Sequence, residues 1–195
     1  MLQSALLAFY LAFLALAMVL PTVRVWRQSG INPLVLPRDD TTEGFVGLWF
    51  KLVIGALGLY LALGAAGVIG QIGVMVLPFA APAALIGWGL LVASLVWVML
   101  AQSQMGRSWR VGIDRNVATE LVSSGLFRIS RNPIFLGMIV QLGGLALVMQ
   151  DGVTVAVLIV GYLLISIQIR LEEAYLAGLH GNAYAQYRSS VRRWL

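Results

Sequence analysis

Polar residues that are able to bind or orient a small molecule gather near the end of the last apolar run of the chain. Gln168, Arg170, Glu172 and Glu173 follow one another closely there. Helical spacing places Gln168 and Glu172 on one face of a helix, and Arg170 and Glu173 on another. Carboxylates at this depth are costly unless they are paired or face a polar cavity. We therefore expect Glu172 to accept hydrogen bonds from a ligand and Arg170 to orient an anionic group. The alternative is a solvated helix end with ordinary ion pairs.

A second polar segment, residues 102–133, is rich in arginine and precedes the fourth apolar run. Gly125 within it is typical of a turn, and Pro133 suits the first turn of a helix, where the missing N–H is not needed. Asn132 directly before the proline predicts an N-cap. A well-formed helix start would explain Asn132 and Pro133, but it would not explain the arginines and aromatic residues around them.

The composition predicts a membrane protein and excludes several kinds of site. Hydrophobic residues make up 60% of the 195 residues and charged residues only 11%, and the mean hydropathy is +0.89. A soluble domain carries about 25% charged residues, so this chain cannot cover a water-facing surface in the usual way. The absence of cysteine excludes thiolate chemistry, and the single histidine, His180, excludes a multi-histidine metal centre, so we expect no metal. The net charge of +5 indicates topology signals and headgroup contacts, and we expect no nucleic-acid partner.

Five apolar runs predict an all-α bundle of about five transmembrane helices. The runs cover about residues 2–20, 45–69, 78–100, 134–149 and 153–169. The last two are short for a bilayer that requires about 20 apolar residues. Only Gln150, Asp151 and Gly152 separate them, which predicts a tight helical hairpin. Glycines recur along the runs and predict close packing between helix backbones in lipid.

Arginines are concentrated in alternate connections between the runs. No positive residue precedes the first run, whereas arginines follow it, which predicts a retained helix and not a signal peptide. The positive-inside rule then places the N-terminus outside and the C-terminus in the cytoplasm, since the opposite connections carry only Asp151. The arginines that support this orientation are Arg24, Arg27, Arg38, Arg107, Arg110, Arg115, Arg128, Arg131, Arg170, Arg188, Arg192 and Arg193.

Three blocks in the C-terminal half of the chain form a recognisable pattern. They are Leu121–Phe127 (LVSSGLF), Arg131–Gly137 (RNPIFLG), and Glu172-Glu173 followed by His180–Tyr187 (HGNAYAQY). Taken in order, with a helical hairpin between the second and third, they resemble the isoprenylcysteine carboxyl methyltransferase family and its phospholipid methyltransferase relatives. The resemblance covers the chain from about Gly106 to its end.

The resemblance implies a pocket for S-adenosylmethionine that opens to the cytosol, with a route for a lipid substrate from the bilayer. Carried over by position, the catalytic residues are Arg170, Glu172 and Gln168, and the helix that bears Gln168 and Arg170 lines the substrate side. The aromatic rings of Phe127, Phe135 or Trp109 are suited to face the cationic sulfur. Cofactor contacts are expected at Thr119, Glu120, Leu121, Val122, Phe127, Asn132, Pro133, Ile134, Phe135 and Glu172.

The chain departs from the family pattern at several of these positions. Asn132 replaces a histidine, Phe127 and Phe135 replace tyrosines, and Gln168 stands where the family has an arginine. Asparagine still donates and accepts hydrogen bonds, and phenylalanine keeps the ring without the hydroxyl. These differences leave cofactor binding in place and point to a different methyl acceptor.

We therefore predict an S-adenosylmethionine-dependent methyltransferase in a bacterial inner (cytoplasmic) membrane, with its active site facing the cytoplasm. Its partners are the lipid bilayer and a small amphipathic or lipid-like acceptor with a carboxylate, amine or thiol. A single transmembrane domain, residues 1–195, is expected, with three spans in 1–100 and the cofactor loop, hairpin and tail in 101–195. The alternatives are a non-catalytic membrane protein of the same fold and a related reductase with a nicotinamide cofactor. A transporter is disfavoured because the spans contain almost no charge.

Overall fold

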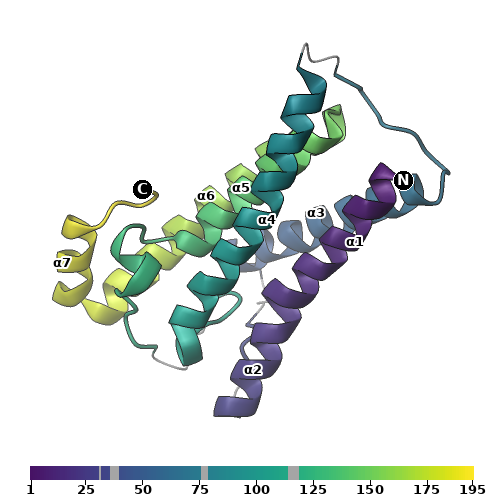
Figure 1. The fold of residues 1–195 in the computed structure, drawn as a ribbon. Coiled ribbons are helices and arrows are strands. Elements are labelled where there is room, and N and C mark those ends of the chain that lie inside the picture. The colour runs from purple at the N-terminus through teal and green to yellow at the C-terminus, as the bar shows by residue number, and fades with distance from the viewer. Residues whose placement is uncertain (31, 36–39, 76–78, 114–118) are drawn as a thin grey trace.

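The computed structural model describes residues 1–30, 32–35, 40–75, 79–113 and 119–195, and in these the regular structure is helical (Figure 1). Pro78, Arg38 and Arg115, on which parts of the span and orientation predictions fall, lie outside the described residues. The elements are α1 (Leu2–Leu14), the π-helix η1 (Ala15–Val19), α2 (Leu20–Ser29), α3 (Thr42–Ala65), α4 (Ala80–Met105), the 3-10 turns η2 (Gly106–Ser108) and η3 (Gly125–Arg128), α5 (Pro133–Met149), α6 (Gly152–His180) and α7 (Asn182–Ser190).

Four of the described helical stretches are long and apolar enough to cross a membrane. They are Leu2–Ser29, Thr42–Ala65, Ala80–Ser108 and Gly152–His180. The fourth predicted span, α5, is also apolar but has only 17 residues, which at 1.5 Å per residue gives about 25 Å against a hydrocarbon thickness of about 30 Å. The bundle is therefore polytopic and helical as predicted, with one helix shorter than the others.

The first helix continues without a break past the proline in its sequence, through a π-helical turn. Pro21 has no N–H to donate to the carbonyl of Ala17, four residues earlier. The side-chain amide of Gln102, on α4, donates to that carbonyl instead, at 2.7 Å. The freed backbone acceptor thus becomes a contact between the first helix and α4.

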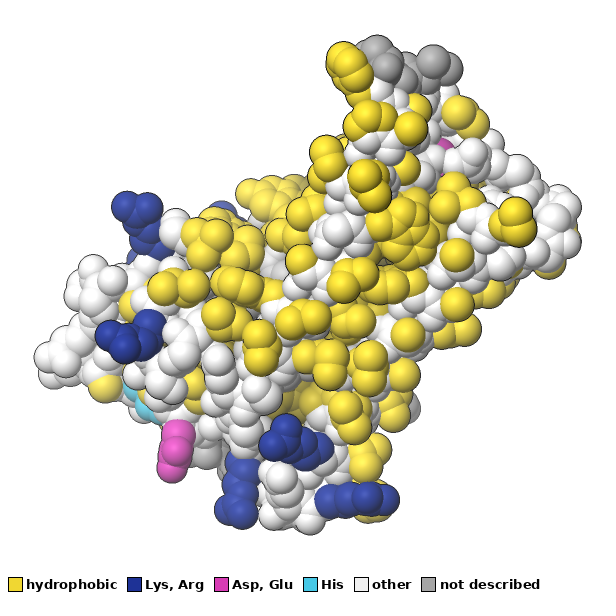
Figure 2. Space-filling model, in the orientation of Figure 1, with side chains coloured by type: hydrophobic (Ala, Val, Ile, Leu, Met, Phe, Trp, Pro, Cys, Tyr) yellow, Lys and Arg dark blue, Asp and Glu magenta, His cyan; other side chains and the backbone are white. Residues whose placement is uncertain are grey.

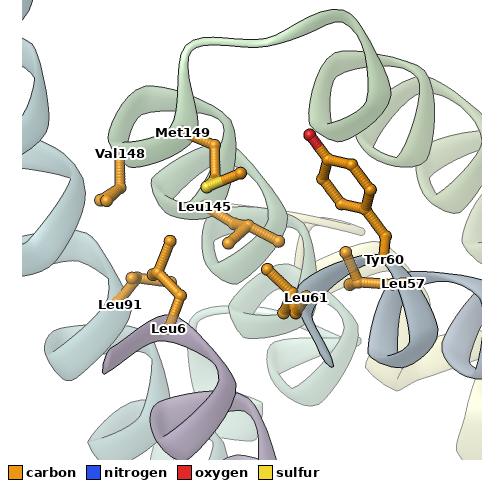
Figure 3. Packing of buried hydrophobic residues seen from close by; sticks show 8 residues of the cluster. All are labelled: Leu6, Leu57, Tyr60, Leu61, Leu91, Leu145, Val148 and Met149. Atoms are coloured by element: carbon orange, nitrogen blue, oxygen red, sulfur yellow. The ribbon is translucent and has the colours of Figure 1, made fainter. Parts of the chain in front are cut away.

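The hairpin between α5 and α6 is held by a buried carboxylate. Asp151 is fully buried and caps α6, accepting a hydrogen bond from the backbone N–H of Thr154 at 2.8 Å. The hydroxyl of Tyr60, on α3, donates to the other oxygen of Asp151 at 2.6 Å, and Figure 3 shows this hydroxyl directed toward the turn. The predicted tight hairpin is confirmed, since α5 ends at Met149 and α6 begins at Gly152.

The core of the bundle lies on the hairpin side of the molecule. It contains Leu6 of α1, three residues of α3, Leu91 of α4 and three residues of α5 (Figure 3). Its buried members are Leu6, Leu57, Tyr60, Leu61, Leu91, Leu145, Val148 and Met149. The helices that meet there bring the first residues of α1 and α6 to one end of the bundle.

The opposite end of the bundle carries the polar loops. There α4 ends, α5 begins, and α7 lies with the C-terminus beside the last turns of α6 (Figure 1). On the visible face, lysine and arginine side chains gather toward this end, and the rest is largely apolar (Figure 2). The segment after α2 contacts the polar loops through two backbone hydrogen bonds of 2.9 Å. The N–H of Val35 donates to the carbonyl of Val111, and the N–H of Val111 donates to the carbonyl of Pro33. Gly112, with φ of +87°, allows this approach because a Cβ would overlap the carbonyl of Val35.

Candidate active site between the loop and the bundle

A buried carboxylate paired with two guanidinium groups, one buried and one partly exposed, joins the segments of the polar end. The carboxylate of Glu173 on α6, 7% exposed, lies 3.1 Å from Nη2 of Arg131 in the preceding loop. Arg193 of the C-terminal tail donates to the same carboxylate through Nε at 3.1 Å and Nη2 at 2.8 Å. These hydrogen bonds raise the pKa of Arg193 above its usual value. Paired in this way, the carboxylate can stay charged although it is buried.

Asn132, which replaces the family's histidine, belongs to this cluster. Its side-chain amide donates to Glu173 Oε1 at 3.4 Å and to the carbonyl of Arg193 at 3.2 Å. Asn132 is the N-cap residue of α5 and Pro133 opens the helix, as predicted, but the side chain of Asn132 makes no capping hydrogen bond. The amide nitrogen is a donor, and it is turned toward the buried carboxylate, which offers it a stronger acceptor than solvent does.

The C-terminal tail is fastened over the loop that precedes α5. The hydroxyl of Tyr187, on α7, donates to the carbonyl of Phe127 at 2.7 Å, and burial raises the pKa of Tyr187 to about 12. The backbone N–H of Arg131 donates to the carbonyl of Arg192 at 2.9 Å. The 125–132 loop, the tail and the end of α6 are therefore joined to one another by hydrogen bonds and ion pairs.

Glu172, adjacent in sequence to Glu173, faces a different environment. It accepts a hydrogen bond from Nε2 of Gln168 at 2.8 Å, as the helical spacing predicts. Both side chains line a cavity of about 280 Å³ between α1, α3, α4, α5 and α6, called here the bundle cavity. Phe135, Ile134 and the buried Trp109 line the same cavity.

A second cavity lies in the polar loops and has a volume of about 620 Å³. We call it the loop cavity. Its lining is polar, with the hydroxyls, amides and charged groups of Ser29, Gln104, Arg107, Ser108, Arg110, Thr119, Glu120, Ser123 and Ser124, together with Met105, Leu121 and Val122. Met105 and Arg110 also line the bundle cavity, so the two cavities adjoin at these residues.

The residues predicted to contact a cofactor fall into three groups. Thr119, Glu120, Leu121 and Val122 line the loop cavity, and Ile134, Phe135 and Glu172 line the bundle cavity. Neither lining includes Phe127, Asn132 or Pro133. Phe127 is buried, Asn132 belongs to the charge cluster, and the carbonyl of Pro133 accepts a hydrogen bond from the indole of Trp97 at 2.8 Å.

Arg170 lies apart from the two cavities. It is exposed, and its guanidinium donates to the carbonyl of Ser166 on its own helix at 2.5 Å. Glu173, which helical spacing placed on the same face, pairs with Arg131 and Arg193 instead. Two residues correspond to about 200° of rotation around a helix, so Arg170 points away from the cavity that Gln168 and Glu172 line.

Sequence reasoning did not single out Arg110 or Glu43 as site residues, although both line the bundle cavity. Glu43 lies in the first turn of α3, where an acidic residue is expected for favourable interaction with the helix end. Arg110 was counted only as a topology signal. It follows the aromatic Trp109 directly, but Arg128 follows Phe127 in the same way, so no local signal distinguishes Arg110 from the other arginines of the loop.

A bundle of apolar helices that encloses an apolar cavity beside a polar one defines an integral membrane protein with a site for small molecules. The particular family is the phospholipid methyltransferase family, whose model matches residues 82–183, and the chain belongs to it. The matched segment runs from the first turn of α4 to the start of α7 and contains both α5 and α6. No curated protein and no solved structure matches the chain significantly.

Proposed function

We propose that this protein is an S-adenosylmethionine-dependent methyltransferase that acts on a small amphipathic or lipid-like acceptor. The observation that carries the proposal is the meeting of two unlike cavities at Met105 and Arg110 inside the segment matched by the family. A polar cofactor and an apolar acceptor each find a suitable lining there, and methyl transfer requires the two to lie side by side.

The residues of the loop cavity fit S-adenosylmethionine. Its volume of about 620 Å³ lies within the range of small-molecule sites, roughly 300–1,000 Å³. The Glu120 carboxylate is suited to the ribose hydroxyls and the ammonium group, and Arg107 and the serine hydroxyls to the carboxylate. When bound, the cofactor supplies an electrophilic methyl group on a positively charged sulfur. Thr119–Val122 would hold it, with Arg110 at the boundary to the acceptor.

The chain's own residues contribute positioning and the exclusion of water more than acid–base chemistry. The rings of Trp109 and Phe135 line the bundle cavity, where aromatic faces attract a cation. Glu172 stabilises positive charge at the same place, and its hydrogen bond to Gln168 fixes its orientation. A carboxylate or thiolate acceptor reacts without the loss of a proton, whereas an ammonium group must first pass a proton to a base so that its nitrogen has a free electron pair, a role for which Glu172 is placed.

The same arrangement supports the proposed orientation in the membrane. Arg107, Arg110, Arg128, Arg131 and the arginines of the tail all belong to loops at the end of the bundle that carries the cavities. With these loops in the cytoplasm, as the positive-inside rule requires, the loop cavity opens toward the soluble methyl donor. The proposal therefore includes an inner (cytoplasmic) membrane with the N-terminus outside.

Binding of S-adenosylhomocysteine to the purified protein tests the function. Calorimetric titration in detergent is expected to show saturable binding, and Glu120→Ala and Arg107→Ala are each expected to weaken it about tenfold, since each removes a charge-assisted contact to the ammonium or carboxylate group of the ligand. Lys51→Ala, at an exposed position of α3, is the control and retains full affinity. Binding of NADPH in a parallel titration would point to the reductase. Binding of neither ligand would favour the non-catalytic protein and contradict the proposal.

A further inference from the structure

The bundle cavity changes from polar to apolar along its length. At the end near the loops, its lining includes Gln168 and Glu172 of α6, Glu43 of α3 and Arg110. At the hairpin end it is formed by aliphatic side chains from five helices, namely Leu6, Leu57, Leu91, Leu145 and Val157. A ligand that fills this cavity must therefore have a polar head toward the loops and an apolar tail toward the hairpin.

Polar side chains along the middle of the cavity are already hydrogen-bonded within the protein. The hydroxyl of Tyr10 donates to the carbonyl of Ile54 at 2.7 Å, and the amide of Gln102 donates to Ala17. Gln141 accepts a hydrogen bond from Ser94 at 2.5 Å. Because these bonds run between helices, an unbranched hydrocarbon chain can pass without breaking them.

The charges on the lining favour a cationic head. Among the described residues, two carboxylates and one guanidinium line the cavity, which leaves a formal excess of one negative charge. The carboxylate of Glu172 accepts a hydrogen bond from the amide of Gln168, which carries no charge. A carboxylate in so apolar a cavity gains more from an ammonium group than from a second anion.

The volume limits the tail to a single chain. An apolar cavity of about 150 Å³ accommodates benzene, which corresponds to about 25 Å³ per carbon. By this measure, the 280 Å³ of the bundle cavity hold about eleven carbons. The two chains of a membrane phospholipid have about three times that number, so they cannot both be enclosed.

We propose that the bundle cavity binds a single-chain alkyl amine of about ten carbons, with its nitrogen beside Glu172 and its tail between Leu57, Leu145 and Val157. This deepens the proposed function and rests on it, because the amine is then the methyl acceptor. The bound ammonium group would first pass a proton to the carboxylate of Glu172. The neutral nitrogen would then form a bond to the methyl carbon while the bond between that carbon and the sulfur breaks, so that S-adenosylhomocysteine is the leaving group. It also separates this protein from an enzyme whose acceptor is an intact two-chain phospholipid.

The test measures formation of S-adenosylhomocysteine from S-adenosylmethionine by the protein in phosphatidylcholine nanodiscs. Four probes are compared, which are decylamine, hexadecylamine, decanoate and dioleoyl phosphatidylethanolamine. Decylamine is expected to give at least a tenfold higher rate than each of the others. Equal or faster turnover of the phospholipid or of decanoate would overturn the proposal. So would the absence of turnover with all probes while S-adenosylhomocysteine still binds, a result that leaves the proposed cofactor untouched.

Two substitutions on one helix locate the tail. Val157→Phe, in the lining, is expected to lower the rate with decylamine about tenfold and to leave hexylamine unaffected, since the ring fills only the far end. Val160→Phe, at an exposed position of α6, is the matched control and is expected to change neither rate. If Val157→Phe slowed both amines equally, or neither, the tail would not lie there. The rate with hexylamine shows that the variant is folded.

Discussion

Two neighbouring glutamates at the end of α6 have separate tasks because successive residues of a helix point about 100° apart. Glu173 turns toward the tail and is neutralised by Arg131 and Arg193, whereas Glu172 turns into the bundle cavity. The pairing of Glu172 with Gln168 was predictable, since both residues lie on one helix face four positions apart. The partners of Glu173 were not predictable from the sequence, because Arg131 belongs to the loop before α5 and Arg193 belongs to the tail.

Replacing the buried glutamate is expected to destabilise the protein strongly. Glu173→Gln leaves two guanidinium groups facing a neutral amide, and removal of one partner from a buried ion pair costs about 3–5 kcal/mol. Arg193→Gln is expected to cost less, because Arg193 is partly exposed and Arg131 still pairs with the carboxylate. Unfolding in mixed detergent and SDS measures both changes.

Arg192→Gln is the matched control for the tail. Its side chain is exposed and only its backbone carbonyl takes part in the cluster, so its unfolding midpoint is expected to match that of the wild type. If Arg193→Gln and Arg192→Gln behaved alike, the ion pair with Glu173 would contribute nothing to stability.

At the scale of the elements, the contact between α4 and α5 is built on glycines that face each other. A Cβ added to Gly87 would lie 2.7 Å from the carbonyl oxygen of Gly144, and one added to Gly144 would lie 2.9 Å from that of Gly87. Lipid provides little hydrophobic drive for association, so close backbone approach is what stabilises this pair. Gly143, by contrast, has open space where a Cβ would be.

Alanine substitution of the adjacent Gly143 and Gly144 of α5 therefore tests how much close packing contributes to stability. Gly144→Ala is expected to lower the free energy of unfolding by about 1–3 kcal/mol, because the methyl group meets backbone atoms that cannot move independently. Gly143→Ala is expected to be neutral or slightly stabilising, since alanine is the better helix former. SDS titration of both variants measures their free energies of unfolding. Equal losses at the two positions would show that helix propensity, and not packing, governs this contact.

The elements themselves were largely predictable, while their ends were not. Apolar composition located every long helix, but α6 continues to His180 and not to about 169, and the first helix continues to Ser29 and not to about 20. Hydropathy reports which residues prefer lipid, whereas a helix ends where its backbone hydrogen bonds end. Polar residues beyond the predicted end, such as Glu172, therefore belong to α6 and extend it into the candidate site. The sequence also did not reveal which glycines would contact each other.

At the scale of the whole molecule, the bundle has one end that holds it together and one that carries the site. The hairpin end contains the buried Asp151 with its hydrogen bonds from Tyr60 and Thr154, and it adjoins the aliphatic core. The loop end contains the loop cavity, the polar part of the bundle cavity and the tail, whereas the aliphatic part of the bundle cavity extends to the core residues of the hairpin end. α3, α4, α5 and α6 contribute to both ends, so the proposed binding of two ligands requires no separate soluble domain.

This division predicts that stability can be lowered at the hairpin end without loss of cofactor binding. Tyr60→Phe removes a hydroxyl that donates to Asp151 and also accepts from the backbone N–H of Ile72 at 3.3 Å. The loss leaves a buried carboxylate oxygen with one partner fewer, at a cost of about 1–3 kcal/mol. Affinity for S-adenosylhomocysteine is expected to stay within twofold of the wild type, because Tyr60 lines neither cavity.

Tyr162→Phe, at an exposed position of α6, controls for removal of a hydroxyl and should change neither the stability nor the affinity. If Tyr60→Phe weakened binding in proportion to stability, the two ends would be coupled through the long helices, and the cavities would depend on the hairpin for their shape.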